Sequence, residues 1–200
     1  MSEFSKNFME WCSTKTNTFI ETGTFKGQTT KLSSQFFKNV MTVEINPENY
    51  ALSKANLNGI SNIDMYFGDT NELLADMIQK AEGPITFWLD AHPMDPKVDA
   101  ACPLIEELDI IAQNLGDKEA IILIDDLHRC LMGDGDYPKL EELEAGLKKI
   151  NSNYEIKQLP FNTWKVKFGN PTILCGTPFS FEFENSFFMN EKKKKRFIWF

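Results

Sequence analysis

Short apolar runs alternate with longer amphipathic segments along the first 150 residues. The runs are bounded by polar residues and are mostly apolar on both faces, which is typical of buried parallel strands. We predict strands at residues 18–21, 40–45, 63–67, 85–90 and 120–125. The amphipathic segments predict helices at residues 27–38, 47–57, 70–81, 103–115 and 138–150. Strand–helix alternation of this kind predicts an α/β fold, a Rossmann-like doubly wound sheet with right-handed crossovers.

The pattern changes after residue 151. Residues 154–159, 164–168 and 172–175 read as strands joined by turns, with no room for helices, and residues 179–184 alternate as another strand would. We therefore predict a mostly parallel sheet with an antiparallel addition at its edge. No repeat or low-complexity linker interrupts the chain, so we predict a single domain over residues 1–200, with a core at about 17–176 and a C-terminal extension at 177–200.

Composition narrows the class of protein. The net charge of −8 disfavours a broad nucleic-acid-binding surface, so we expect no nucleic-acid partner. No apolar run approaches the roughly 20 residues that span a bilayer, and the N-terminus lacks the apolar core of a signal peptide. The four cysteines form no Cys-x-x-Cys pair, which favours a reducing compartment. We predict a cytoplasmic protein.

The most informative stretch runs from Phe19 to Gly27. An apolar run ends in Glu21, a turn containing Gly23 follows, and a second apolar run ends in Glu44 about twenty residues later. Glycines let the backbone approach a ligand closely, and the second acid can hold two ribose hydroxyls. The layout is typical of a site for an adenosine-containing cofactor at the carboxyl edge of a parallel sheet.

The glycine spacing bears on which cofactor this is. A dinucleotide fingerprint needs Gly-x-Gly-x-x-Gly, but Phe25 stands where the middle glycine is common. An acid just before the turn would repel a pyrophosphate, whereas Glu21 can receive the ammonium of an amino-acid cofactor. The stretch therefore favours S-adenosyl-L-methionine (SAM) over NAD.

Glu-Thr-Gly-Thr-Phe-Lys-Gly resembles the turn of class I SAM-dependent methyltransferases, in the version carried by metal-dependent sugar O-methyltransferases of the macrocin type. The resemblance covers residues 17 to 130. It implies that Glu21 and Gly23 face the methionine part of SAM, that Glu44 binds the ribose, and that residues 68–70 lie by the adenine. The predicted cofactor-binding residues are Glu21, Gly23, Thr24, Gly27, Glu44, Gly68, Asp69, Thr70 and Asp90. Taken singly, Glu44 and Asp69 could instead cap the helices that follow them.

Acids and histidines follow the fourth and fifth predicted strands, at the same edge as the cofactor. Asp90 and His92 follow the fourth, and Asp125, Asp126 and His128 follow the fifth. Magnesium prefers oxygen ligands, so the three aspartates could hold Mg²⁺ or Mn²⁺. The resemblance agrees, because these sugar methyltransferases hold magnesium with an aspartate and an Asp-Asp pair after the same strands.

A bound cation would orient two substrate hydroxyls and lower their pKa, and a base would then take the proton. His92 is our first choice for that base and His128 the second, with Asp90 beside them. The plainer interpretations are that Asp125 and Asp126 begin a loop and that the histidines are structural.

Two polar segments, residues 93–102 and 132–137, are expected to form loops over the substrate side. The basic run Lys192–Arg196 precedes four apolar residues. It is either a solvated terminus, a patch for an anionic surface, or a segment that docks against another domain or chain.

The sequence thus predicts a SAM-dependent O-methyltransferase that methylates a hydroxyl of a sugar or glycan. A catechol-like acceptor, a metal-dependent hydroxylase of the same general fold, and a silent adenosine-binding module are the alternatives. The silent module would have no need for the three aspartates, and the hydroxylase would usually need more than two histidines.

Overall fold

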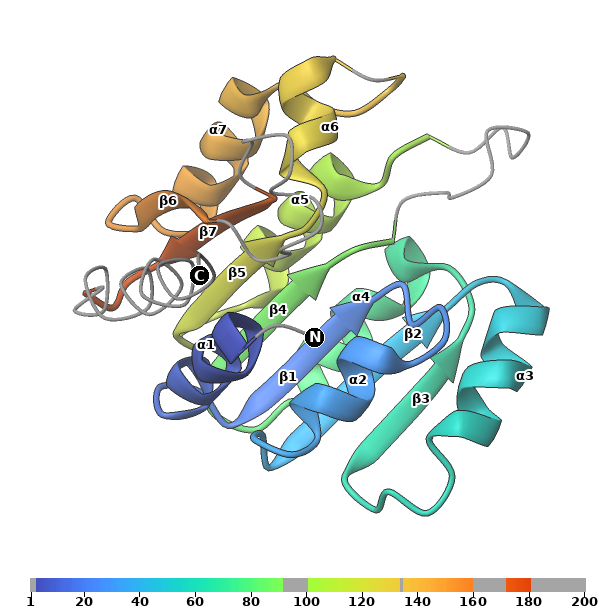
Figure 1. Cartoon of the computed structure of the whole chain (residues 1–200). Helices are drawn as coiled ribbons and strands as arrows, with labels where there is room; N and C mark the ends of the chain where they lie inside the picture. Colours follow the sequence, from blue (N-terminus) through green and yellow to red (C-terminus); the bar gives the residue numbers. More distant parts are fainter. Residues whose placement is uncertain (1–2, 92–100, 134, 160–171, 181–200) are drawn as a thin grey trace, which may run out of the picture.

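A seven-stranded sheet forms the centre of the molecule, in the order β3-β2-β1-β4-β5-β7-β6 (Figure 1). This computed structural model describes residues 3–91, 101–133, 135–159 and 172–180. The strands are β1 (Thr18–Thr22), β2 (Asn39–Glu44), β3 (Ile63–Phe67), β4 (Ile85–Leu89), β5 (Ala120–Ile124), β6 (Glu155–Leu159) and β7 (Ile173–Thr177). The first five pair in parallel, whereas β7 is antiparallel to both β5 and β6. The predicted Rossmann-like α/β sheet with an antiparallel edge is confirmed.

The predicted strands lie within one or two residues of those observed. Because the first five are parallel, their carboxyl ends meet at one edge. The crossovers reverse between β1 and β4, which is where open α/β sheets bind their ligands. The strand predicted at residues 164–168 lies outside the described residues. Of residues 179–184, only Phe179 and Ser180 are described, and neither is in a strand.

The helices are α1 (Glu3–Ser13), α2 (Gln28–Ser33), α3 (Pro47–Asn56), α4 (Thr70–Lys80), α5 (Leu104–Asn114), α6 (Leu127–Met132) and α7 (Leu140–Ile150). Neither α1 nor α6 is predicted from the sequence, and α2 ends five residues earlier than expected. The backbone beyond it tightens into turns, with Phe36 donating to the Ser33 carbonyl. These turns bring Phe37 against Phe19, with ring centroids 5.0 Å apart.

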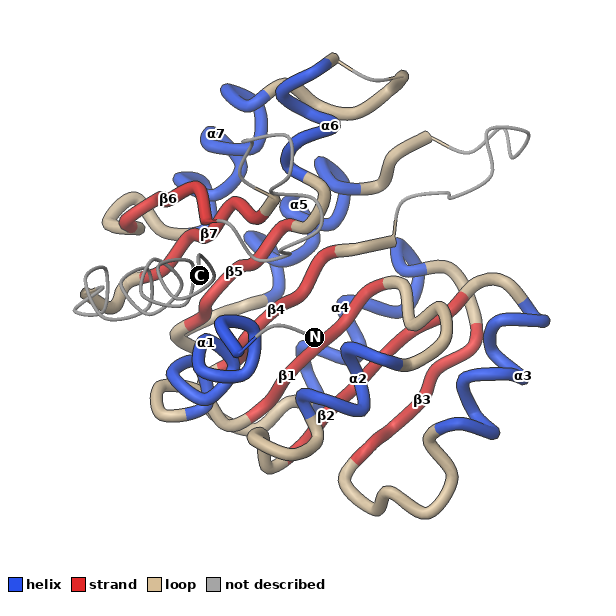
Figure 2. Tube along the Cα trace, in the orientation of Figure 1, coloured by secondary structure: helices blue, strands red, loops and turns tan. Residues whose placement is uncertain are grey.

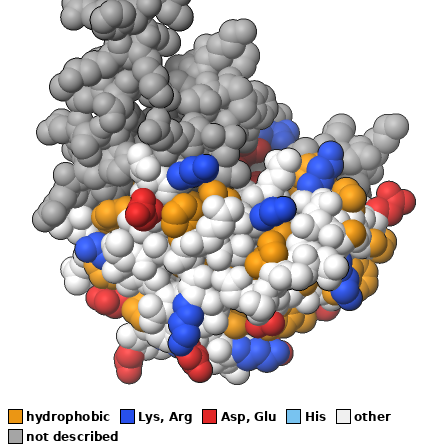
Figure 3. All heavy atoms as spheres, turned by 60° about the horizontal axis from the view of Figure 1, so that its bottom comes forward, with side chains coloured by type: hydrophobic (Ala, Val, Ile, Leu, Met, Phe, Trp, Pro, Cys, Tyr) orange, Lys and Arg blue, Asp and Glu red, His pale blue; other side chains and the backbone are white. Residues whose placement is uncertain are grey.

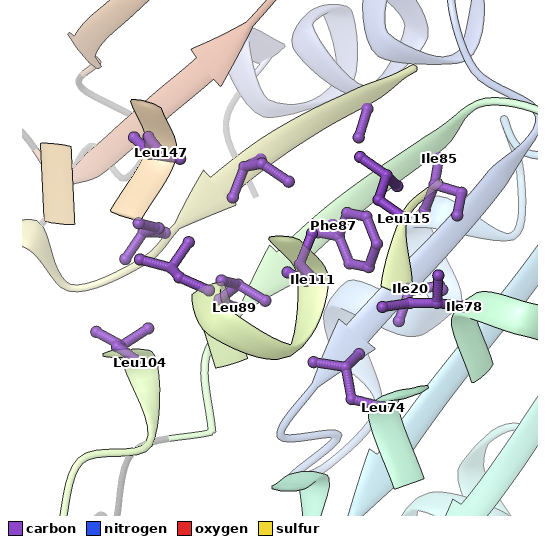
Figure 4. Packing of buried hydrophobic residues seen from close by; sticks show 14 of the residues in the cluster. Ile20, Leu74, Ile78, Ile85, Phe87, Leu89, Leu104, Ile111, Leu115 and Leu147 are labelled. Atoms are coloured by element: carbon purple, nitrogen blue, oxygen red, sulfur yellow. The ribbon is translucent and has the colours of Figure 1, made fainter. Parts of the chain in front are cut away.

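The helices divide the core into two layers (Figure 2). One face of the sheet packs against α1 and α2 through a cluster that includes Phe8, Leu32 and Trp88. The other face packs against α4, α5 and α7. Figure 4 shows part of this second layer, where Ile20 and Phe87 meet Leu74, Ile78 and Ile111. The alternation along each strand therefore decides which layer a polar side chain at its end will enter.

Charged side chains of both signs are interspersed on the face shown in Figure 3. None of the helices in the described ranges is both long and apolar enough to span a bilayer. All four cysteines are buried and free, so the chain holds no disulfide between them. The cytoplasmic location remains a prediction.

Candidate active site

The turn after β1 is built around a close approach of two strand ends. Gly23 has a φ of +82°, and a Cβ at this position would lie 2.4 Å from the Asp90 carbonyl oxygen. Any side chain would therefore push β1 away from the end of β4. The backbone N–H groups of Gly23 and Thr24 both donate to the Val43 carbonyl, at 3.0 and 3.1 Å. The turn is thus held between the ends of β2 and β4.

The second half of this turn also adopts left-handed backbone. Gly27 has a φ of +74° and begins α2, and a Cβ there would crowd the Leu57 side chain. Phe25 has a φ of +48°, which is uncommon for an aromatic residue. The geometry is held in place because the Phe25 N–H donates to a carboxylate oxygen of Glu44, 2.7 Å away. Sequence reasoning noted Phe25 only as a missing glycine.

Glu21 lies beneath this turn, on the face of the sheet that packs against α2. Its side chain is buried, and its Oε2 accepts hydrogen bonds from the hydroxyls of Thr30 and Thr42. Thr42 also shares a hydrogen bond with Thr24. Burial raises the pKa of Glu21 to about 7, against the lowering effect of the two hydroxyls. An acid that holds its proton near neutrality can respond to a cation placed beside it.

Glu44, at the end of β2, organises the neighbouring turns. Its Oε2 accepts from the Phe25 N–H, and its Oε1 accepts from the Asn46 N–H at 2.8 Å. The alternative interpretation of Glu44 as a helix cap is wrong, because Asn46 makes this cap with a side chain that accepts from the first turn of α3. Glu44 therefore ties two loops together, and each of its oxygens has a second lone pair to offer a ligand.

The end of β3 lies beside Glu44. The Gly68 N–H donates to the Glu44 carbonyl at 3.1 Å, and the φ of Gly68 is +150°. Asp69 caps α4 by accepting from the Asn71 N–H at 2.9 Å, so the capping interpretation of this acid holds. Thr70 is buried at the start of the helix. These residues adjoin the predicted adenine site, but one oxygen of Asp69 is already engaged.

Exposed apolar side chains accompany these acids, and sequence reasoning missed them. Ile45 directly follows Glu44 and is 62% exposed. Phe67, at the end of β3, is 54% exposed and packs against Tyr50 with ring centroids 5.1 Å apart. A flat apolar ligand gains most from such surfaces, because it covers area that is otherwise in contact with water. The sequence did carry a signal for Ile45, because this apolar residue directly follows Glu44 at the end of an apolar run.

Asp90 follows β4 and meets the end of β1. Its N–H donates both to the Thr22 carbonyl at 3.1 Å and to the Thr22 hydroxyl at 3.2 Å. The Trp88 indole N–H lies 3.5 Å from the Asp90 carboxylate. The cofactor turn and the predicted catalytic aspartate therefore share one backbone junction. His92 and most of the predicted 93–102 loop lie outside the described residues.

Asp125 and Asp126 follow β5, which pairs directly with β4. The Asp126 N–H donates to the Asp125 carboxylate at 2.7 Å, as expected for a loop start. Asp126 has a φ of +53° and begins α6, and its carboxylate lies 3.6 Å from Nδ1 of His128. The structure brings all three predicted metal ligands to the carboxyl ends of two adjacent strands, β4 and β5.

The arrangement of these aspartates does not form a metal site. Across the described parts of the chain, no three histidine, cysteine or acidic side chains converge closely enough to hold a metal ion. The residues as placed here do not fit a magnesium ion, so no chemical step below depends on one.

The predicted 132–137 loop reaches this edge through Tyr137. The Arg129 guanidinium stacks over the Tyr137 ring, 4.6 Å from its centroid, and donates to its hydroxyl at 3.0 Å. Burial raises the pKa of Tyr137 well above its ordinary value; Arg129 opposes this, while the carboxylates of Asp126 and Asp90 add to it. The charges of both aspartates therefore act on the Tyr137 hydroxyl. Asp134, in the same loop, is outside the described residues.

Glu107 is the acid at this edge that the sequence did not reveal. It lies in the first turn of α5, is fully buried, and faces the sheet from the side opposite Glu21. Burial raises its pKa to about 8, and the nearby Thr22 hydroxyl lowers it. Acids in a first helical turn are usually solvated, so no sequence signal separated Glu107 from its exposed neighbour Glu106.

Known proteins resemble this chain in structure but not in sequence. No family model matches the sequence, and no curated protein does. Solved structures do match. An O-methyltransferase from Bacillus cereus, in complex with SAH, is 12% identical, with 88% of this chain and 82% of that chain covered and a TM-score of 0.61.

Two further structures agree with this match. Cofactor-bound Rv0187 from MTB is 16% identical over 88% of this chain and 80% of its own, with a TM-score of 0.63. The O-methyltransferase TomG from Streptomyces achromogenes, in complex with SAM, is 14% identical over 86% and 77%, with a TM-score of 0.55. Identities this low are evidence for the fold and leave the acceptor open. The chain has the Rossmann-like fold shared by SAM-dependent methyltransferases.

Proposed function

We propose that this chain is a SAM-dependent O-methyltransferase that acts on a hydroxyl of a small molecule or glycan. One observation carries the proposal: Glu21, Glu44 and Asp90 end three adjacent strands on either side of the point where the strand order reverses. Open α/β sheets bind ligands there. The structural likeness to methyltransferases with bound cofactor supports the choice of SAM.

In this proposal the chain's own residues divide the binding work. Glu44 accepts the ribose hydroxyls while it continues to hold the Phe25 N–H. The exposed Ile45 covers the adenine ring, and Glu21 lies beneath the turn that receives the methionine part. Gly23 keeps the two strand ends close enough for one ligand to touch both.

The methyl group comes from the sulfonium of SAM, whose carbon–sulfur bond breaks as the carbon–oxygen bond forms. The electron pair of the broken bond stays on sulfur, and the acceptor's proton must leave. His128 accepts that proton in our scheme, and the Asp126 carboxylate 3.6 Å away stabilises the imidazolium. His92 remains the other candidate for the base.

A sugar acceptor is favoured by the resemblance of residues 21–27 to sugar methyltransferases. Tyr137 and Arg129 give the acceptor side an aromatic surface with a positive charge over it. Such a surface also suits a catechol-like ring, so the acceptor class must be decided by assay. The resemblance also implies metal assistance, but Asp90, Asp125 and Asp126, although they lie at adjacent strand ends, do not converge on an ion as placed here.

Calorimetric titration with SAM, with and without magnesium and with NAD as a control, tests the cofactor assignment. We expect micromolar binding of SAM and none of NAD. Methyl transfer to sugar and catechol acceptors is then measured with and without a chelator. Binding without any transfer would support the silent adenosine-binding module. Failure to bind SAM in either condition would remove the proposal.

A further inference from the structure

Glu107 is a fully buried acid for which the fold offers no regular partner. Neither of its carboxyl oxygens makes a hydrogen bond of acceptable geometry to any residue in the described ranges. Buried polar groups are usually hydrogen-bonded, and each exception asks for an explanation. The position of Glu107 at the ligand-binding edge, beneath the junction of β1 and β4, suggests one.

Thr22 is the group through which Glu107 reaches the site. The Thr22 hydroxyl oxygen accepts the N–H of Asp90 at 3.2 Å, which leaves the hydroxyl hydrogen for another acceptor. Thr22 follows Ile20 by two residues in β1, so its side chain lies on the face of the sheet that packs against α5. The Thr22 hydroxyl lowers the pKa of Glu107, although no hydrogen bond of regular geometry joins the two side chains here. A hydrogen bond between these two side chains would complete a chain from Asp90 through Thr22 to Glu107.

The charge state of Glu107 suits this task. The charged groups that act on it are Asp69, at the start of α4, and Glu106 on its own helix, and both are acidic. Together with burial they hold its pKa at about 8, so the side chain is a neutral acid at neutral pH. A neutral carboxyl can share a hydrogen bond with a hydroxyl without placing a charge in the core.

We propose that Glu107 is a positioning residue of the methyl-transfer site, which holds the β1–β4 junction through a hydrogen bond with Thr22. The inference rests on the proposed function, because the junction matters only if a ligand uses it. Glu21 supports the turn from one face of the sheet, and Glu107 supports the junction from the other. The cofactor thereby meets strand ends fixed on both sides.

The test compares Glu107→Leu with Glu107→Gln, and uses Glu106→Leu as a matched control on the exposed side of the same turn. SAM binding is measured by calorimetry and folding by thermal unfolding. Glu107→Leu removes the carboxyl but keeps the volume, so we expect a stably folded protein that binds SAM about tenfold more weakly. Glu107→Gln keeps a neutral hydrogen-bonding group and restores affinity to within about twofold. Glu106→Leu leaves the affinity unchanged.

A double-mutant cycle separates positioning from a structural role. Thr22→Val causes the same loss as Glu107→Leu, and the double variant is no worse than either, because both break one chain of contacts.

Wild-type affinity in Glu107→Leu, or additive losses in the double variant, would overturn the positioning role alone. If the wild-type protein binds no SAM, the proposed function fails first and the positioning role falls with it.

Discussion

At the scale of single residues, Gly23 and Gly59 share a backbone conformation but not surroundings. Their φ angles are +82° and +84°. A Cβ on Gly23 would collide with the Asp90 carbonyl, whereas nothing lies within 4 Å of a Cβ on Gly59. The pair therefore separates the cost of left-handed backbone from the cost of crowding at the site.

We expect Gly59→Ala to lower the free energy of unfolding by about 1 kcal/mol, from the backbone alone. Gly23→Ala should cost about 1–3 kcal/mol more and abolish SAM binding, because it forces the strand ends apart. Urea denaturation and calorimetry measure the two effects. If the two variants had equal stability and equal SAM affinity, the close approach of β1 to β4 would not be needed for SAM binding.

The Glu44 carboxylate has two roles: it accepts hydrogen bonds from two backbone N–H groups, and in our proposal it also binds the ribose of SAM. Glu44→Ala removes the acceptors of two backbone N–H groups, so we expect a loss of about 2–4 kcal/mol in the free energy of unfolding. SAM affinity should fall by at least about tenfold. Glu48→Ala, an exposed acid in the next helix, serves as the control and should change neither. Unchanged affinity in Glu44→Ala would remove this residue from the cofactor site.

The sequence predicts which acids lie at strand ends, but it does not predict which acids are buried in the core. Glu21 and Glu44 could be found because each ends an apolar run before a turn. Glu107 could not, because its burial depends on how α5 packs on the sheet. The sequence likewise placed Asp90, Asp125 and Asp126 at one edge, but whether they converge on a metal depends on side-chain geometry that no spacing encodes.

At the scale of elements, the sequence predicts the parallel strands but not the helices α1 and α6. Four of the five parallel strands are almost wholly buried and leave apolar runs typical of buried strands, whereas β3 is partly exposed. Six residues of α6 span too few turns to show a helical period, and the helix starts from the left-handed Asp126. The amphipathic α1 precedes the strand–helix alternation, which begins at β1, so this pattern does not predict it.

The contact between α5 and α7 depends on a glycine. A Cβ on Gly146 of α7 would lie 2.7 Å from the Leu108 side chain of α5, next to Glu107. We expect Gly146→Leu to cost about 1–3 kcal/mol in the free energy of unfolding, because it overpacks this contact. Ala145→Leu, on the exposed side of the same helix, should have little effect. Urea denaturation of both variants checks the expectation, and equal stabilities would contradict it.

At the scale of the whole molecule, Glu21 and Glu107 link stability to pH. Their pKa values of about 7 and 8 exceed the ordinary 4.5, so the folded state holds these protons more tightly than the unfolded state. Their contribution to the free energy of unfolding is therefore largest at low pH and declines between about pH 4.5 and 8. The slope reaches at most about 1.4 kcal/mol per pH unit for each carboxyl.

Replacing both acids with glutamine should flatten this decline. Urea denaturation between pH 5 and 9, for the wild-type protein and the Glu21→Gln/Glu107→Gln variant, measures the difference. Glu48→Gln provides the control, because that side chain is exposed and does not act on either buried acid. Parallel curves for the wild-type protein and the double variant would show that neither buried acid carries its proton to neutral pH.

The strand order has a consequence for synthesis on the ribosome. β5 pairs on one side with β4 and on the other with β7, which ends at Thr177. Until that residue emerges, the nascent chain presents the open edge of a wholly apolar strand, the kind of edge that recruits other chains. We expect a chain stopped at residue 153 to collect in the insoluble fraction, whereas the full chain stays in solution. Because the sheet closes late, β6 and β7 protect the nascent chain against aggregation during translation.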